Sequence, residues 1–201
     1  MEHDLFAWHI EVSKALDAQT SVADGMQTLL AFCSKQYRSK SWGRIGDLDF
    51  DSDVADLEKW LTGVLTKEPP PSSLKAFWFG IFFPIYDGEA SCDTYLAGAS
   101  EFDPDDESFE WACVPDYFPD GRYAHSKILH EIYHTVKRAR SPASALGEYI
   151  LCLAYTAFAV RELAKRVNSK LWLGKSKQRA LAVGFDSGDG VLLDPLSRSA
   201  G

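Results

Sequence analysis

Apolar residues recur every three or four positions along the first third of the chain, the spacing of one face of a helix. Three such sets occur: Leu5, Trp8, Val12 and Leu16; Met26, Leu29, Leu30, Cys33 and Tyr37; Val54, Leu57, Trp60, Leu61 and Val64. We therefore expect three helices, the second capped by Ser21 and the third by Asp51 or Asp53. The glycine-containing segment 41–50 predicts a loop, and the prolines at 69–71 end the third helix.

The period of the pattern changes in the middle of the chain. Residues 74–86, LKAFWFGIFFPIY, are rich in aromatic and β-branched side chains and are too apolar to alternate. This is typical of a central strand buried on both faces, here ending near Pro84. The Asp87-Gly88 pair predicts a turn, after which residues 92–100, CDTYLAGAS, return as a second strand.

Two helices and two strands are expected in the second half, after an acidic loop that contains prolines. The helices should cover about 124–139 and about 143–167, the latter behind a Ser-Pro pair suited to the N-cap and the first helical position. Residues 179–185 and 190–196 are typical of strands, and the sequence DSGDG between them predicts a turn.

This order of elements predicts an α+β fold, with a small, mostly antiparallel sheet of about four strands packed with about five helices. We expect one domain over residues 1–201, helical over about 1–66 and sheet-containing over about 75–196. Residues 66–74 are the best candidate for a linker between the two parts.

Charge and composition narrow the classes of function. The formal net charge is −8 and the isoelectric point about 5.1, which argues against binding to a nucleic-acid backbone or an anionic membrane. The first residues, MEHDLFAWHIEV, lack a basic region followed by an apolar one, so we expect no signal peptide and a cytoplasmic protein. The apolar run 149–160 is too short to span a bilayer. The four cysteines form no C-x-x-C pair, so neither a zinc ribbon nor a dithiol motif is expected.

One short motif carries specific chemistry. Residues 130–134, HEIYH, match H-E-x-x-H, which on a helix places two histidines one turn apart beside a glutamate. The motif resembles that of zincin metallopeptidases over these five residues. In that interpretation His130 and His134 bind Zn²⁺ and Glu131 activates the metal-bound water, which makes a zinc-dependent hydrolase the alternative function.

The flanking sequence disfavours the zinc site. An apolar stripe on this helix is formed by Ile128, Leu129, Ile132, Tyr133 and Val136. The two histidines lie nearly opposite that stripe, beside Lys127, Lys137 and Arg138, which predicts a solvated face. No histidine follows His134, so a third ligand would have to be Glu148 or Glu162. We expect no metal and no catalytic residue here.

An acidic segment, residues 47–58, has part of the spacing of a calcium loop. Asp47, Asp49, Asp51 and Glu58 stand at four ligand positions of an EF-hand, but Ser52 stands where the sharp turn needs glycine. A loop that leads into a helix with acids in its first turn is the better interpretation, since the helix dipole favours acids there.

A second acidic segment, residues 101–120, contains eight acids, five aromatic residues and no base. Aromatic side chains supply anchors that lose their water on binding, and carboxylates steer and pair with Arg or Lys of a partner. Some of the aromatic residues, Trp111 above all, can instead fix the loop to the core. The predicted partner-binding residues are Asp103, Asp105, Asp106, Glu107, Glu110, Trp111, Asp116, Tyr117 and Asp120, with the acids of residues 47–53 as a second patch.

The segments YLAGASEFDPDDESFEWACVPDYFPDGRYAHSKIL and ALAVGFDSGDGVLL resemble small bacterial cytosolic immunity proteins of polymorphic toxin systems. The resemblance covers about half of the chain, mostly residues 76–129 and 179–193. It implies no catalytic residues. It implies a protein that binds a cognate toxin domain tightly and covers or distorts its active site. We also expect no cofactor. A scaffold or regulatory domain with an unrelated partner is a third alternative.

Overall fold

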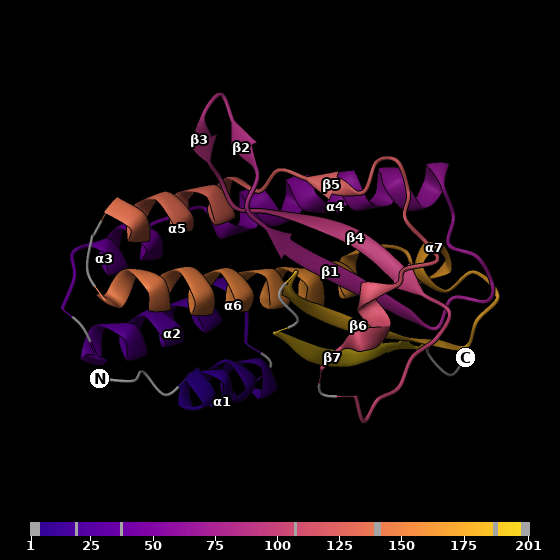
Figure 1. The fold of residues 1–201 in the computed structure, drawn as a ribbon, viewed down its shortest axis with the longest axis horizontal. Helices are drawn as coiled ribbons and strands as arrows, with labels where there is room; N and C mark the ends of the chain where they lie inside the picture. Colours follow the sequence, from indigo (N-terminus) through magenta and orange to yellow (C-terminus); the bar gives the residue numbers. More distant parts are fainter. Residues whose placement is uncertain are drawn as a thin grey trace.

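A mixed sheet forms one half of the molecule and a group of helices extends from it (Figure 1). The computed structural model describes residues 5–18, 20–36, 38–106, 108–138, 142–186 and 189–197. The helices are α1 (Leu5–Asp17), α2 (Val22–Gln36), α3 (Ser41–Gly46), α4 (Phe50–Lys67), α5 (Lys127–Arg138), α6 (Pro142–Arg166) and α7 (Ser169–Leu173), with a 3-10 turn η1 (Glu110–Cys113). The strands are β1 (Ala76–Phe82), β2 (Ile85–Tyr86), β3 (Glu89–Ala90), β4 (Asp93–Ala99), β5 (Tyr123–Ala124), β6 (Gln178–Phe185) and β7 (Gly190–Ser197).

The five-stranded sheet has the order β5-β4-β1-β6-β7, so β1 is its central strand, as its apolar sequence predicts. Ala76 of β1 lies opposite Ala99 in an antiparallel pairing with β4 and opposite Ala180 in a parallel pairing with β6. The two outer pairings are antiparallel. The α+β class and the mostly antiparallel sheet are therefore confirmed.

The counts of about four strands and about five helices were too low. The described part of the chain contains seven α-helices, five strands in the main sheet and two in a separate hairpin. The additional elements are short: β5 has two residues, α3 six and α7 five. Elements of one turn or two residues are too short to show a hydrophobic period.

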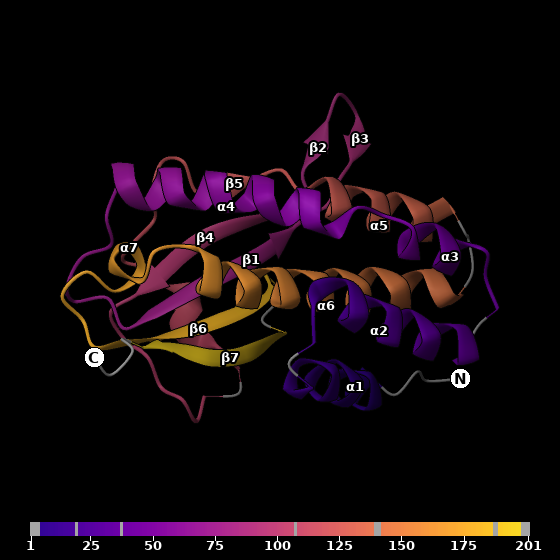
Figure 2. The same ribbon diagram turned by 180° about the vertical axis from the view of Figure 1, so that it is seen from behind.

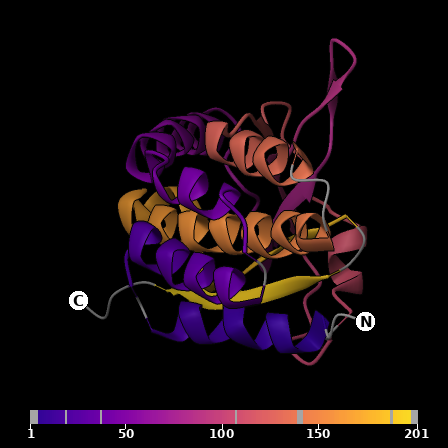
Figure 3. The same ribbon diagram turned by 90° about the vertical axis from the view of Figure 1, so that its left-hand side faces the viewer.

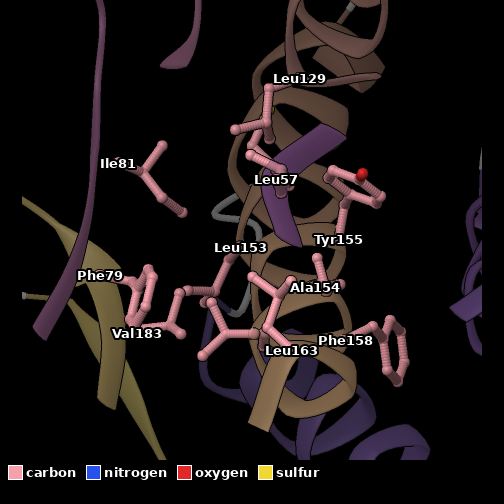
Figure 4. Packing of buried hydrophobic residues seen from close by; sticks show 14 of the residues in the cluster. Leu57, Phe79, Ile81, Leu129, Leu153, Ala154, Tyr155, Phe158, Leu163 and Val183 are labelled. Carbon is pink, nitrogen blue, oxygen red and sulfur yellow. The ribbon is translucent and has the colours of Figure 1, made fainter. Parts of the chain in front are cut away.

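Helices cover one face of the sheet, with α6 as the central helix (Figure 2). In the core, Phe79 of β1 and Val183 of β6 point toward Leu153 of α6, whereas Tyr155 and Phe158 point away from the sheet (Figure 4). A Cβ added at Gly25 of α2 would overlap the ring of Phe158, so the missing side chain lets α2 approach α6 closely. None of the helices in the described ranges is long and apolar enough to cross a membrane.

Local capping sets where the N-terminal helices begin. The Ser21 hydroxyl oxygen accepts the Asp24 N–H at 3.1 Å, which confirms Ser21 as the cap of α2. The cap of α4 is Asp49, which accepts the Ser52 N–H at 3.1 Å, and not Asp51 or Asp53. The predicted loop 41–50 is also wrong in part, because its first six residues form α3. Trp42 and Ile45 stand three positions apart and are both buried, which stabilises this short helix.

The Asp-Gly turn closes a hairpin that leaves the sheet (Figure 3). Asp87 and Gly88 both have positive φ, 49° and 84°, as a two-residue hairpin turn with two left-handed residues requires. The turn joins β2 to β3. The sequence had suggested a direct connection between β1 and β4, which is wrong. Ile85 at the start of this hairpin is 72% exposed.

Candidate partner-binding surface

The second face of the sheet is covered by a loop and not by helices. Residues 100–122 cross it, and η1 lies in front of the strands in Figure 1. Under this loop Trp78, Ala97 and Ala182 form a small core of their own, separate from the main one. Trp111 of η1 packs edge-on against Trp78 with ring centroids 6.0 Å apart, and Phe109 packs against the same ring at 5.5 Å.

Two glycines let aromatic rings lie directly on the sheet. A Cβ added at Gly80 of β1 would overlap the ring of Tyr95, and one added at Gly184 of β6 would overlap the indole of Trp78. The rings therefore occupy the space that side chains at these positions would fill. This gives the outer face of the sheet a flat aromatic floor.

A groove with a volume of about 450 Å³ lies beside this floor. Besides Trp78 and Tyr95, aromatic rings that line it belong to Phe82, Phe109, Phe118 and Tyr123. One carboxylate, Asp186, stands at the groove, and its Oδ1 accepts a hydrogen bond of 2.8 Å from the Tyr95 hydroxyl. Burial and the neighbouring Asp186 raise the pKa of Tyr95, so its hydroxyl stays protonated and keeps donating.

A second hollow, of about 680 Å³, lies on the other side of η1. Among the residues that line it are the predicted partner-binding residues Asp103, Glu110, Trp111 and Asp116. Lys75 is the basic residue in this lining. Within the described ranges, no ion pair includes a residue of 101–120, so the negative charge of the loop is not neutralised by contact with Lys or Arg.

Hydrogen bonds within the loop hold its carboxylates in place. Asp103 Oδ1 accepts the Asp105 N–H at 3.0 Å, and Asp106 Oδ1 accepts the Ser108 N–H at 2.9 Å. The Ser108 hydroxyl, followed by backbone N–H groups, lowers the pKa of Asp106. In the same way the hydroxyl and the N–H of Ser100 lower the pKa of Asp116. Three of the acids of the loop, Asp103, Asp106 and Asp116, are therefore held in fixed positions.

The predicted contact residues differ in exposure. Asp103, Asp105, Glu110, Asp116 and Asp120 are exposed, whereas Asp106 and Trp111 are half-buried. Glu107 lies outside the described residues.

Tyr117 is only 6% exposed, and its hydroxyl donates to the Glu68 carbonyl at 2.6 Å. It therefore holds the loop to the end of α4 and offers no surface to a partner, which corrects its placement among the contacts. Trp111 packs its ring against Trp78. This is the alternative role predicted for it, that of fixing the loop to the core.

The acids of the second predicted patch differ in exposure. Asp47, Asp49 and Asp51 are exposed at the α3–α4 junction, but Asp53 is only 3% exposed. Its Oδ2 accepts hydrogen bonds of 2.6 Å from Ser126 and Tyr155. Sequence reasoning missed this role, although the signal was present: Asp53 shares the face of α4 that buries Phe50, Val54 and Leu57.

The four acids with calcium-loop spacing do not surround one position. Asp51 lies in the first turn of α4, and Glu58 stands seven residues further along the same helix, a rise of about 10 Å. The interpretation of a loop that leads into a helix with acids at its start is therefore confirmed.

The apolar stripe of α5 is confirmed, because all five of its predicted residues are buried. The solvated face predicted for the two histidines is wrong. His130 Nδ1 lies 3.0 Å from the Ser91 hydroxyl, and His134 Nε2 is buried without a hydrogen-bond partner among the described residues. The chain between β3 and β4 packs over this side of the helix. Burial, with His134 beside it, lowers the pKa of His130.

A buried carboxylate, also missed by sequence reasoning, stands next to these histidines. Asp93 Oδ1 lies 2.9 Å from His125 Nδ1, and Asp93 Oδ2 accepts the Tyr86 hydroxyl at 2.6 Å. This hydrogen bond raises the pKa of Tyr86 to about 12. The ring of His125 lies 5.8 Å from that of His130, which lies 4.2 Å from that of His134. Among the described residues no group of three or more His, Cys, Asp or Glu side chains could hold a metal ion.

No protein-family model, no characterised protein and no solved structure matches the chain. Two surfaces stand out: the acidic loop 101–120 with its two hollows, and the cluster of polar side chains where the β2–β3 hairpin meets α5.

Proposed function

We propose that the chain is an immunity protein, which binds a cognate toxin domain through the acidic loop 101–120 and inhibits it. The observation that carries the proposal is the array of exposed carboxylates, among them the hydrogen-bonded Asp103 and Asp116, that has no ion pair with a cation in the described structure. An array of this kind attracts a basic protein surface. The resemblance of this segment to immunity proteins of polymorphic toxin systems points in the same direction.

The shape of the surface supports binding to a protein. η1 stands between two hollows, one lined by carboxylates and the other by aromatic rings. Aromatic anchors beside charged groups are the composition of energetically important interface regions. Because Asp103, Asp106 and Asp116 are held by hydrogen bonds from neighbouring residues, little conformational freedom of these three would be lost on binding.

The mechanism of inhibition would be occlusion. A toxin that acts on nucleic acid has a basic active-site face, because that face binds phosphates. The carboxylates of Asp103, Asp105 and Glu110 would occupy the positions of those phosphates. The bound chain would then exclude the substrate.

The test begins with candidate toxins encoded beside this chain. Each is expressed in a bacterial host with and without the chain, and growth is measured. The expected result is that one candidate stops growth and that coexpression restores it. If no neighbouring product binds the chain or is neutralised by it, the proposal fails.

Two matched triple variants then locate the surface. D103K/D105K/E110K reverses three exposed acids of the loop, and D47K/D51K/E89K reverses three exposed acids elsewhere, with the same change in net charge and with Asp49, the cap of α4, left in place. Calorimetry is expected to show at least a hundredfold loss of affinity for the first variant, about 3 kcal/mol, and a small loss for the second. Equal losses would mean that only total charge matters, and an unchanged affinity of the first variant would overturn the placement.

A further inference from the structure

The aromatic groove is built as a continuous set of rings. Phe82 and Tyr123 have centroids 5.3 Å apart, Phe82 and Tyr95 5.9 Å, and Tyr95 and Phe118 6.1 Å. Its volume of about 450 Å³ lies within the usual range for small-ligand pockets, about 300–1,000 Å³. A side chain or small ligand that enters would meet ring faces and edges on several sides.

The carboxylate of Asp186 gives this groove a negative charge. It is the single charged residue among the described residues that line the groove, and it is exposed. The Tyr95 hydroxyl binds Oδ1 at 2.8 Å and fixes the orientation of the carboxylate. An apolar occupant would cover Asp186 without pairing it, which is costly. A cation would pair with Asp186 and at the same time contact the negative faces of the rings.

Two of the rings that line the groove already contact the guanidinium group of Arg122. Arg122 Cζ lies 3.9 Å from the centroid of Phe118 and 4.6 Å from that of Tyr123. Arg122 Nη1 donates to the Pro119 carbonyl at 3.1 Å, and Arg122 is not part of the groove lining. The chain itself therefore shows which cationic group suits these rings.

We infer that the groove is a binding site for an arginine side chain, held between aromatic rings and paired with Asp186. The assignment of that arginine to a partner protein rests on the proposed function, whereas the chemistry of the site does not. Arginine fits better than lysine because a planar, weakly hydrated guanidinium stacks on rings and forms a two-pronged pair with a carboxylate.

The test uses a small probe and needs no partner. N-acetyl-arginine-N-methylamide is titrated into the full-length protein, and the NMR signals of the Trp78 indole and the Tyr95 ring are followed. Saturable shifts are expected with a Kd on the order of millimolar. The citrulline counterpart has the same shape without the charge and should bind at least tenfold more weakly. The lysine counterpart should fall between them.

Two variants complete the design. D186N should abolish the preference for arginine over citrulline, whereas D51N removes a charge at a distant exposed position and should change nothing. Equal binding of arginine and citrulline, an unaltered preference in D186N, or no saturable shift would overturn the inference.

The outcome is separable from that of the proposed function. If the probe binds but no toxin is neutralised, the arginine site stands and the immunity proposal fails. If a toxin is neutralised and D186N binds it as tightly as the unaltered chain does, the immunity proposal stands and the groove is not where an arginine of the toxin enters.

Discussion

The carboxylate of Asp53 accepts a hydrogen bond of 2.6 Å from the hydroxyl of Tyr155, although 102 positions of the chain separate the two residues. The same oxygen accepts the Ser126 hydroxyl at 2.6 Å, and the other oxygen accepts the Lys127 N–H at 2.8 Å. Asp53 thus joins α4 to α6 and caps the beginning of α5. Burial, and then the charge of Asp53, raises the pKa of Tyr155, which keeps its hydroxyl a donor.

Replacing Asp53 should destabilise the fold more than replacing any exposed acid. D53A leaves three donors without an acceptor, two of them on buried side chains, so we expect a loss of about 3 kcal/mol in the free energy of unfolding. D53N keeps the shape but loses acceptor capacity, and should lie between D53A and the unaltered chain. Urea unfolding measures both. D51A, two positions earlier and exposed, is the control and should change stability by less than about 0.5 kcal/mol. Similar midpoints for D53A and D51A would contradict the joining role.

Two glycine substitutions should have different effects, one mainly on binding in the groove and the other mainly on the stability of the sheet. G80A forces the ring of Tyr95 to move, which breaks its hydrogen bond to Asp186, so binding of the arginine probe should fall at least tenfold. G184A meets Trp78 and also the backbone at Asp189 and Gly190, which cannot move as easily. Its cost should be the larger one, about 2–3 kcal/mol in the free energy of unfolding. Thermal unfolding and the NMR titration are measured on both, and a G80A chain that binds the probe normally would count against the position assigned to Tyr95.

Stability should depend on the protonation of His130. Its pKa is lowered in the folded chain from the ordinary value of 6.5, so protons bind more readily to the unfolded chain. The contribution is fully present above about pH 6.5 and is lost as the pH falls below that value. H130N places an amide where Nδ1 stands and removes the titration. Unfolding at pH 7.5 and 5.5 should show a larger loss of stability for the unaltered chain than for H130N.

The comparison with H130N is needed because another group of the chain, Glu148, titrates in the opposite sense. Burial raises the pKa of Glu148 above its ordinary 4.5, so its contribution to stability falls as the pH rises past that value. The effect of Glu148 on stability is the same in the unaltered chain and in H130N, so it cancels when their free energies of unfolding are compared. Parallel profiles for the two chains would show that His130 does not sense pH.

Metal analysis tests the alternative of a zinc-dependent hydrolase. We expect the purified protein to contain much less than one zinc ion per chain, because His130 Nδ1 faces Ser91 and no third ligand converges on the pair in the described structure. Elemental mass spectrometry gives the ratio directly. One zinc ion per chain that is lost in H130A would favour the hydrolase over the immunity protein.

Features with a local cause could be predicted from the sequence. The central position of β1 follows from a run without polar alternation, the cap of α2 from one serine, and the buried stripe of α5 from a period of three and four. Each depends on residues that are close in the chain. The acidic loop was recognisable for the same reason, since its composition is concentrated within twenty residues.

Features that depend on distant segments could not be predicted. The contact of His130 with the Ser91 hydroxyl joins residues 39 positions apart, and the role of Asp53 depends on a tyrosine in another helix. The aromatic groove joins rings from β1, β4, β5 and the loop, and its floor exists because Gly80 and Gly184 lie beneath rings from neighbouring strands. Hydrophobic periodicity does not predict contacts between residues that lie so far apart in the chain.

The central strand has two neighbours that reach it at very different times during synthesis. β4 follows β1 within roughly 20 residues, but β6 comes roughly 100 residues later and must still enter in parallel register. Until β6 has left the ribosome, one edge of β1 has no strand to pair with. Such an edge can pair with another nascent chain. Deleting β6 and β7 would therefore convert the centre of the sheet into an edge that promotes aggregation.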